Sequence, residues 1–317
     1  MEKLTPFRLL PWFRTRVWGV RDLAPWYDYK ITGEPIGEVW LSGDDCIADT
    51  GPLAGQRFAD IFHSHGEELV GAEGARHERF PLLMKILFPQ EKLSVQVHPG
   101  DAMAQEEGEP HGKTECWYAL EAEPGAAVAL GLHPGATVEE MRTAIESKTL
   151  EKLLEWVPVE KGDMIFVDAG TVHAVGPGVV LLETQQNSDM TYRLYDYGRP
   201  RELHLDKGLK ATRLQTAAGK VTPQAEGDGM LLVRSDYFCV DRHRLANGDV
   251  QGFLSPVSKP AVQLIFIASG RGTLQSEKNA PIELKRGELA VIPACTAEWS
   301  FRASEPVEML RAVPQQA

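Results

Sequence analysis

A strand expected near residue 95 carries polar side chains on one face. In the stretch EKLSVQVHPGDAMAQEEGEPHGKTECWYAL, residues 91–120, Ser94, Gln96 and His98 alternate with leucine and valine. Side chains of a strand alternate between its two faces, so these three polar groups point the same way. They either face water at a sheet edge, or they point into a barrel and hold a bound group there.

Four side chains have the chemistry of metal ligands. Gln96 and His98 share the strand face, and Glu115 begins the next expected strand. His173 follows the turn DAGT. Imidazole nitrogens and one carboxylate oxygen suit Zn²⁺ or a similar divalent ion with open positions, whereas an amide oxygen is a less usual zinc ligand. The alternative interpretation is that each histidine is a structural or exposed side chain at a strand end.

A second pair of histidines competes for the same function. His63 and His65 lie in IFHSHGEE, a more regular spacing. Their neighbours are largely charged, which is typical of a solvated loop or a short helix. We therefore expect the functional metal to lie elsewhere.

Basic residues accompany the expected metal ligands. Lys113 precedes Glu115 by two positions, so both side chains can face inward. In TYRLYDYGRP the alternation places Arg193 on the same face as Thr191, and Arg199 follows at a turn. Arginine binds phosphate through a fixed fork of donors and lysine binds it as a point charge. A surface salt bridge is the alternative for either arginine.

The elements that must position these residues are mostly short strands. Segments such as ECWYALEA, GVVLLETQQ and VQLIFIASGRGTLQS are separated by Gly, Pro, Asn and Asp, a pattern typical of an all-β sandwich or barrel. One segment differs, since Thr137 and Glu140 form a plausible capping box and apolar residues then follow at helical spacing. We expect a small helical insert at about residues 137–157.

A weak internal repeat indicates two similar domains. KGDMIFVDAGTVHAV, residues 161–175, aligns without a gap with RGELAVIPACTAEWS, residues 286–300, and His173 falls opposite Glu298. The pattern predicts two barrels in tandem, of which only the first keeps a site. We expect a catalytic domain over residues 1–215 and a second, metal-free barrel over 216–317.

Composition limits the classes of partner that the protein is expected to bind. The 317 residues carry a formal net charge of −12, which argues against nucleic acid and anionic membranes as partners. Four scattered cysteines form no CxxC pair, and the charged, proline-containing start does not resemble a signal peptide. The expected protein is cytoplasmic and binds a small molecule, and the sequence does not indicate an oligomeric state.

Four motifs taken together resemble a known family. KLSVQVHP, GKTE, GTVHAVGPG and TYRLYDYGR, in this order, are similar to the type I mannose-6-phosphate isomerases in their short bacterial form. The resemblance extends over the whole chain and includes PIGEVWLS near the start. It implies a tandem cupin, a jelly-roll β-barrel fold with one zinc ion in the first barrel and none in the second.

The resemblance also assigns residues and a reaction. The family's metal ligands fall on four residues: Gln96, His98, Glu115 and His173. Its catalytic arginine falls on Arg193, and Ser94, Lys113 and Arg199 match positions around the substrate. The implied reaction interconverts mannose 6-phosphate and fructose 6-phosphate through an enediol. Arg193 suits electrostatic stabilisation of the enediolate, because a guanidinium stays protonated near pH 7. The proton-transferring base stays open between a zinc-bound water and a nearby carboxylate.

Two other classes of protein remain as alternatives. A metal cupin of another kind, such as an Fe(II) oxygenase, would keep the histidines without needing Lys113 and the arginines. A non-catalytic sugar-phosphate sensor would keep the binding groups and lose turnover. Metal analysis with an oxygen-uptake assay separates the first, and an isomerase assay separates the second.

Overall fold

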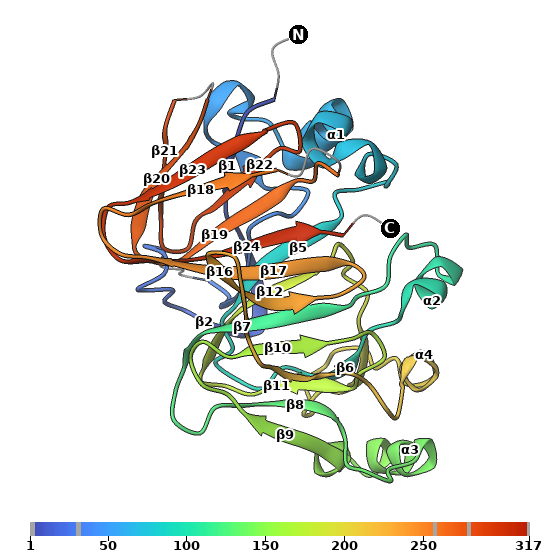
Figure 1. Ribbon diagram of the computed structural model, residues 1–317. Helices are drawn as coiled ribbons and strands as arrows, with labels where there is room; N and C mark the ends of the chain where they lie inside the picture. The colour runs from blue at the N-terminus through green and yellow to red at the C-terminus, as the bar shows by residue number, and fades with distance from the viewer. Residues whose placement is uncertain (1–3, 30–32, 256–258, 278–279, 316–317) are drawn as a thin grey trace.

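The computed structural model describes residues 4–29, 33–255, 259–277 and 280–315. Strands dominate it, and helices are few, so the expectation of a mostly β protein is confirmed. In Figure 1 the C-terminal strands gather in the upper half of the molecule, and the strands from β7 to β12 lie in the lower half. No helix within the described ranges is both long and apolar enough to cross a membrane.

Two sheets enclose the first core. The seven-stranded sheet has the order β14 (Gly219–Val221), β10 (Met164–Val167), β7 (Glu115–Ala122), β12 (Val179–Gln186), β5 (Leu82–Leu87), β3 (Ile36–Trp40) and β2 (Trp12–Val20). The five-stranded sheet has the order β13 (Tyr192–Tyr195), β6 (Val95–Val97), β11 (His173–Val175), β8 (Ala127–Leu132) and β9 (Leu154–Pro158).

Two further sheets enclose the C-terminal core. The eight-stranded sheet has the order β15 (Gln224–Glu226), β16 (Gly229–Arg234), β17 (Phe238–Leu245), β24 (Val307–Pro314), β19 (Gln263–Ser269), β22 (Leu289–Ile292), β1 (Phe7–Leu10) and β4 (Ile47–Ala48). The four-stranded sheet has the order β18 (Val250–Leu254), β23 (Glu298–Ala303), β20 (Arg271–Ser276) and β21 (Ile282–Lys285).

Alternation along β7 shows how the layers pack. Trp117 and Ala119 join the apolar core shared with the five-stranded sheet, whereas Cys116 and Tyr118 join the core shared with the eight-stranded sheet. Both faces of the seven-stranded sheet are therefore covered. Glu115 lies on the Trp117 side of β7 and points toward the five-stranded sheet.

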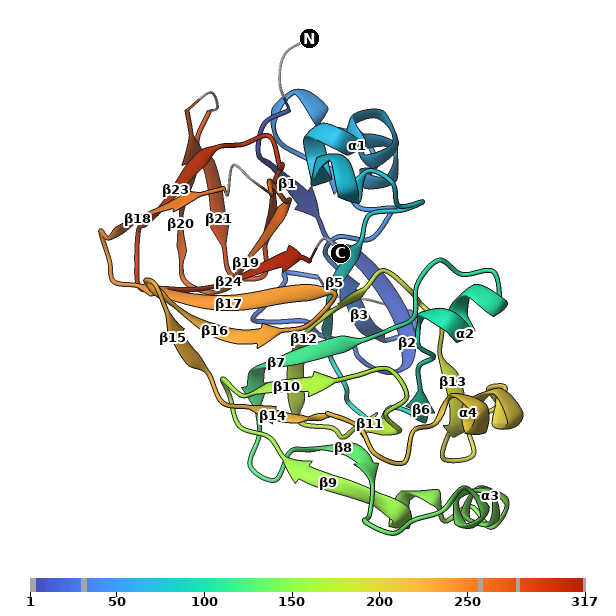
Figure 2. The same cartoon turned by 45° about the vertical axis from the view of Figure 1, so that its right-hand side comes forward.

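The first strand of the chain lies among the last ones. Phe7 of β1 pairs with Val291 of β22, and Leu9 pairs with Ala48 of β4. Figure 2 shows the blue β1 beside the orange and red strands. The N-terminal residues thus extend the C-terminal sheet, an arrangement that local sequence patterns do not indicate.

Helices cover parts of this framework. The structure has α1 (Phe58–Gly74), α2 (Asp101–Glu106), α3 (Val138–Glu146) and α4 (Leu205–Ala211), with short 3₁₀ turns at Gly51–Leu53 and Leu150–Leu153. The capping box of Thr137 and Glu140 is present at the start of α3. The helical insert is shorter than expected, because the chain leaves the helix at Ser147 and residues Leu154–Pro158 form β9. Pairing of β9 with β8 outweighs the helical spacing of Leu154 and Val157.

Candidate active site

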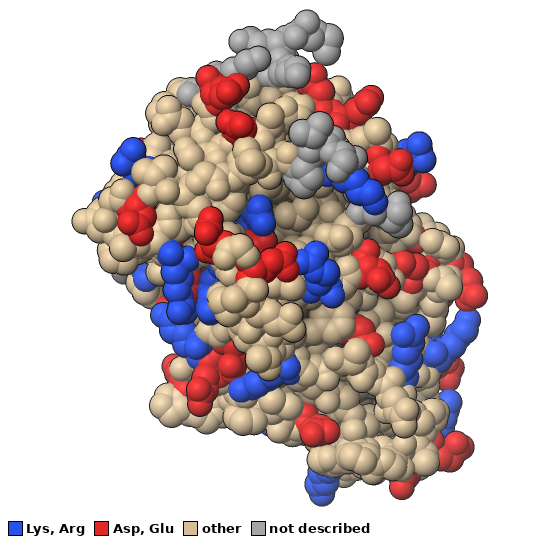
Figure 3. Space-filling view, in the orientation of Figure 1, with Lys and Arg blue, Asp and Glu red and all other residues tan. Residues whose placement is uncertain are grey.

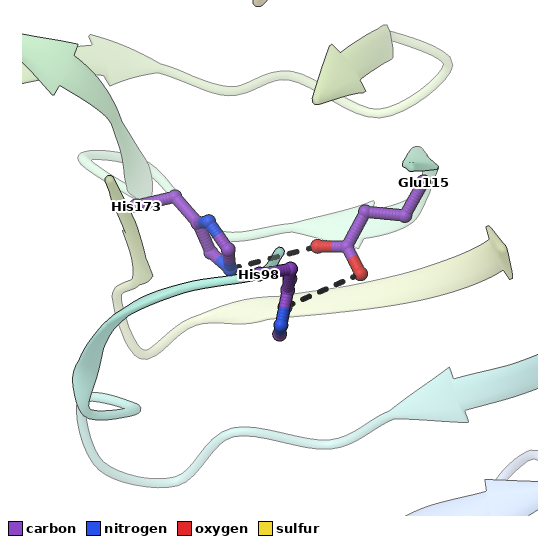
Figure 4. A group of neighbouring side chains, drawn as sticks. All are labelled: His98, Glu115 and His173. Atoms are coloured by element: carbon purple, nitrogen blue, oxygen red, sulfur yellow. Dashed lines mark ion pairs between the residues drawn. The ribbon is translucent and has the colours of Figure 1, made fainter. Parts of the chain in front are cut away.

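Three of the expected ligands converge between the first two sheets. Glu115 begins β7, His173 begins β11, and His98 follows β6 directly. One ligand atom from each lies within 4.8 Å of the others, and all three side chains are buried. Figure 4 shows both imidazole rings directed at the Glu115 carboxylate, with each Nε2 3.6 Å from one of its oxygens. Within the residues that the structure describes, this is the only such cluster.

Backbone carbonyls orient both rings. Nδ1 of His98 donates to the carbonyl of Met190 at 2.7 Å, and Nδ1 of His173 donates to that of Thr171 at 2.9 Å. Each Nε2 therefore presents its lone pair to the centre of the cluster, which is the tautomer that metal-binding histidines use.

The charge states also suit a cation. Burial lowers the pKa of His173 to about 4. Burial, assisted by the Lys113 charge, holds the pKa of His98 well below its usual range. Both rings are neutral at pH 7 and need not lose a proton to bind a metal. Burial and the nearby Glu183 carboxylate raise the pKa of Glu115, and a bound dication would oppose that shift by favouring the ionised form.

Gln96 connects this cluster to the expected catalytic arginine. On β6 it pairs in register with His173 of β11 on one side and with Arg193 of β13 on the other. Partners at such positions project from the same face of a sheet. The amide Nε2 lies 3.2 Å from Nε2 of His173, and the amide oxygen accepts from Ser94 at 3.0 Å. Exchanging the amide oxygen and nitrogen would turn the oxygen toward the histidines, while the nitrogen would donate to Ser94.

A chain of buried charges extends from the cluster, and sequence reasoning recognised only part of it. Nζ of Lys113 lies 2.8 Å from Glu115 and 3.2 Å from Glu183, and Glu183 also lies 3.2 Å from Lys85. Lys85 and Glu183 face each other in register on β5 and β12. The available signal was a single charged residue inside an otherwise apolar strand, since such residues are rarely buried without a partner.

A polar cavity of about 450 Å³ opens beside this chain. The predicted residues Ser94, Gln96, Lys113 and Arg193 line it. Gln96 and Lys113 also contact His173 and Glu115, so the cluster of expected ligands lies directly behind this part of the wall. Cations on several strands and loops contribute to its wall: Arg16, Lys85, Lys113, Arg193 and Arg201. On the face of the molecule drawn in Figure 3, basic and acidic side chains are interspersed. Four acidic residues share the cavity wall, so its basic residues outnumber its carboxylates by one in a chain that is acidic overall: Glu34, Glu38, Glu183 and Asp189.

Among the predicted catalytic and substrate-binding residues, Arg199 is the one that does not line this cavity. Its Nε and Nη2 contact the Asp196 carboxylate at 3.1 and 2.8 Å, and Nη2 also donates to the carbonyl of Lys92. Its role as a phosphate contact stays a prediction.

Other cavity residues were not anticipated. Arg16 on β2 donates through Nε and Nη2 to the two carboxylate oxygens of Glu38 on β3. Arg201 and Asp189 also line the wall. Asp189 and Arg201 flank the recognised TYRLYDYGR motif, and only the way the chain folds back brings Arg201 to the cavity.

The competing histidines lie on α1, away from this cluster. His63 is exposed, and its Nδ1 bonds the carbonyl of Ala59 within the same helix. His65 is 3.9 Å from Glu68, one turn further along. Among the residues that the structure describes, neither belongs to a group of ligand atoms close enough to hold a metal.

Replacing either histidine of α1 is therefore expected to change neither metal content nor activity. His63→Ala and His65→Ala should keep metal content and isomerase activity within about twofold of the original protein, because surface substitutions rarely perturb distant sites. Metal analysis and steady-state kinetics measure this. Loss of metal in either variant would show that the wrong histidines have been assigned.

The fold and the site define a class before any comparison is made. A β protein with a buried two-histidine, one-carboxylate cluster beside a polar cavity that includes five basic residues is suited to metal-assisted chemistry on an anionic small molecule.

Comparisons identify the family within that class. Residues 4–137 match the family described as phosphomannose isomerase type I, catalytic domain. The mannose-6-phosphate isomerase ManA of Bacillus subtilis is 36% identical over 93% of this chain and 95% of its own. That of Streptococcus mutans is 32% identical over 93% of this chain and 95% of its own. The chain belongs to the type I mannose-6-phosphate isomerase family.

A solved structure agrees with this result. The crystal structure of the mannose 6-phosphate isomerase from Bacillus subtilis superposes with a TM-score of 0.86 at 30% identity. The match covers 98% of this chain and 99% of the crystallised one.

Proposed function

We propose that this enzyme interconverts mannose 6-phosphate and fructose 6-phosphate. The observation that carries the proposal is the row of His173, Gln96 and Arg193 across three neighbouring strands, with Glu115 facing it from the other sheet. Gln96 and Arg193 of this row line the cavity, and Gln96 lies 3.2 Å from His173 of the cluster, which supports a site that joins a metal to a guanidinium. Family membership supplies the sugar phosphate as the substrate.

We propose one Zn²⁺ per chain, held by His98, Glu115, His173 and the amide oxygen of Gln96. Two nitrogens and one carboxylate are a donor set that zinc accepts, with room for a further ligand from the cavity. A bound divalent ion supplies Lewis-acid polarisation of the sugar carbonyl, which favours loss of the neighbouring proton. Lys113 donates to His98 Nε2 at 3.1 Å and to Glu115, so its ammonium competes with a cation for these atoms.

The other assignments concern the cavity wall. Arg193 would stabilise negative charge on the sugar oxygens as it develops, because a fixed guanidinium needs no reorganisation at that moment. Ser94 and Lys113 would bind and orient the sugar, and Glu183 would hold Lys113 in place. Asp189 is our candidate for moving the proton between C1 and C2. It lines the cavity, and its charge acts on Lys113.

The cations of the cavity favour this reaction over the alternatives. An Fe(II) oxygenase would not need Lys113 and Arg193 beside its histidines. A sensor would not need Arg193 in register with Gln96 next to the proposed metal ligands. The decisive experiment is a coupled isomerase assay on mannose 6-phosphate before and after chelation, with restoration by added Zn²⁺. Activity that survives complete metal removal would contradict the metal-dependent mechanism, and oxygen uptake would indicate the oxygenase.

We also propose that the chain is a tandem of two cupin barrels, with residues 1–215 catalytic and 216–317 metal-free. The pairing order β10-β7-β12-β5-β3 recurs as β22-β19-β24-β17-β16, and β6-β11-β8-β9 recurs as β18-β23-β20-β21. Glu115 pairs with Val167 where Gln263 pairs with Ile292, so an amide replaces the ligand carboxylate in the second unit. Short strands would be exchanged between the two units. The strands β1 and β4 lie in the sheet of the second unit, and β14 lies in the sheet of the first.

Partners and location follow from the proposed activity and from the sequence. A small sugar phosphate is the proposed partner, and a net charge of −12 argues against nucleic acid and anionic membranes. Scattered cysteines without a CxxC pair support a cytoplasmic location.

A further inference from the structure

The loop after β13 returns to the cavity instead of leaving it. Tyr197 and Gly198 both have positive φ, 54° and 82°, and Arg199 N donates to the Asp196 carbonyl at 3.0 Å. Two successive left-handed residues make the tight turn that reverses a hairpin. The chain then runs back along β13, where His204 N donates to the carbonyl of Arg193 at 2.7 Å.

Asp196 gathers two arginines from this loop. The carboxylate is buried, and Nε and Nη2 of Arg201 contact it at 2.7 and 2.6 Å. Arg199 contacts Oδ1 of the same carboxylate, the oxygen that Nη2 of Arg201 also contacts. Both guanidiniums are thereby held in place, and less side-chain entropy is lost when either one binds a ligand.

The two arginines differ in which N–H donors remain for a ligand and in whether they line the cavity. Arg199 is held by Asp196 and by the Lys92 carbonyl, stacks near the Tyr197 ring at 5.6 Å, and lies outside the cavity lining. The bidentate pair of Arg201 uses Nε and Nη2 and leaves Nη1 for another partner. Arg201 lines the cavity.

Arg193 links the loop to the metal end of the cavity. Its Nη1 donates to the carbonyl of Glu202 at 2.8 Å, next to Arg201. Its Nε is buried and has no hydrogen-bond partner among the described residues. Burial and the Arg201 charge lower the pKa of Arg193. Three guanidiniums thus lie around one buried carboxylate, and the exposed Glu91, 3.7 Å from Arg199, is a further acidic partner. Positive charge still exceeds negative charge in this group, and an anion would neutralise it.

We propose that Arg201 binds the phosphate group of the substrate and that Arg199 is a positioning residue, which fixes Asp196 and through it Arg201. The inference rests on the proposed function for the identity of the substrate, since C6 is the carbon farthest from the reacting C1 and C2. Arg193 lies between the proposed metal site and the proposed phosphate site. It is in register with Gln96 on one side, and it donates to the loop that carries Arg201 on the other.

Phosphate affinity tests this assignment without turnover. Calorimetry with inorganic phosphate would compare the original protein with Arg201→Gln, Arg201→Lys and Arg199→Gln, and with Arg142→Gln as a surface control that removes one charge elsewhere. Arg201→Gln is expected to weaken phosphate binding about tenfold, the loss of one charge-assisted hydrogen bond. Arg199→Gln should weaken it about threefold or less while lowering the melting temperature, and Arg199→Lys should restore part of that stability.

Kinetics give the second measurement. Arg201→Gln should raise KM for mannose 6-phosphate about tenfold with little change in kcat, and should penalise mannose 6-phosphate more than mannose. Arg201→Lys keeps the positive charge, so its KM should lie between those of the original protein and Arg201→Gln. This variant preserves the test if the glutamine variant does not fold. A larger loss in Arg199→Gln than in Arg201→Gln would overturn the inference. Equal losses, or no loss in either variant, would overturn it as well.

The two proposals fail separately. If the original protein binds inorganic phosphate through Arg201 but does not isomerise mannose 6-phosphate, the proposed function is wrong and the phosphate site stands. If it isomerises the sugar phosphate with undiminished affinity in Arg201→Gln, the phosphate assignment is wrong and the function stands.

Discussion

His173→Ala is expected to remove the bound metal and to lower isomerase activity on the order of a thousandfold or more. The substitution deletes one of three close ligand atoms and leaves His98 and Glu115 as an incomplete set. Lewis-acid polarisation contributes several kcal/mol to such reactions, and each 1.4 kcal/mol is about tenfold in rate. Metal analysis of the purified variant, with a coupled assay on mannose 6-phosphate, measures both effects.

The fold should survive this substitution. His173 lies at the start of the three-residue strand β11, and most apolar contacts of the two cores lie elsewhere. Circular dichroism is expected to match that of the original protein, and His63→Ala on α1 is the matched control. Normal metal content in His173→Ala would remove this residue from the site. Full activity in a metal-free preparation would remove the metal from the mechanism.

Arg193→Ala is expected to lose mainly kcat, on the order of a hundredfold. Its side chain projects from the same sheet face as Gln96 and His173. Its charge would therefore act where the enediolate develops, and a donor that acts in the transition state lowers kcat when it is removed. Arg201→Gln, which is expected to change KM, is the comparison variant. Both constants should be measured on mannose 6-phosphate.

The assignment of a catalytic role to Arg193 has a defined contrary outcome. If Arg193→Ala changes only KM, the guanidinium binds the substrate equally in the ground and transition states. The catalytic charge would then have to come from another cation of the cavity, and Lys113 would be the next residue to replace.

Much of the site was accessible from sequence because its residues follow local rules. Ser94, Gln96 and His98 alternate along one short segment, and Glu115 shares a strand face with Trp117. Alternation needs no knowledge of distant pairing, so these predictions could be made from the sequence alone. The convergence of Glu115 with His98 and His173 matches what the motifs implied.

Other features depend on contacts that are distant in sequence. Lys85 lies within the apolar segment LLMKIL, and its importance appears only when β5 pairs with β12 and brings Glu183 opposite. The positions of Arg199 and Arg201 depend on a turn with two left-handed residues, of which Tyr197 gives no clear signal. Strand alternation cannot be extended through such a turn, so it could not decide which arginine reaches the cavity.

The pairing of β1 with β22 has a consequence for how the protein is made. Residue 7 pairs with residue 291, so the first strand emerges from the ribosome long before its partner has been synthesised. At about 5–20 residues per second, the wait lasts roughly 15 to 60 seconds. During translation the edges of β1 have only the short strand β4 to pair with, while the nascent metal-binding region can already assemble. We expect ribosome-bound chains that end before residue 289 to leave their N-terminus open to proteolysis, and release of the full chain to close it.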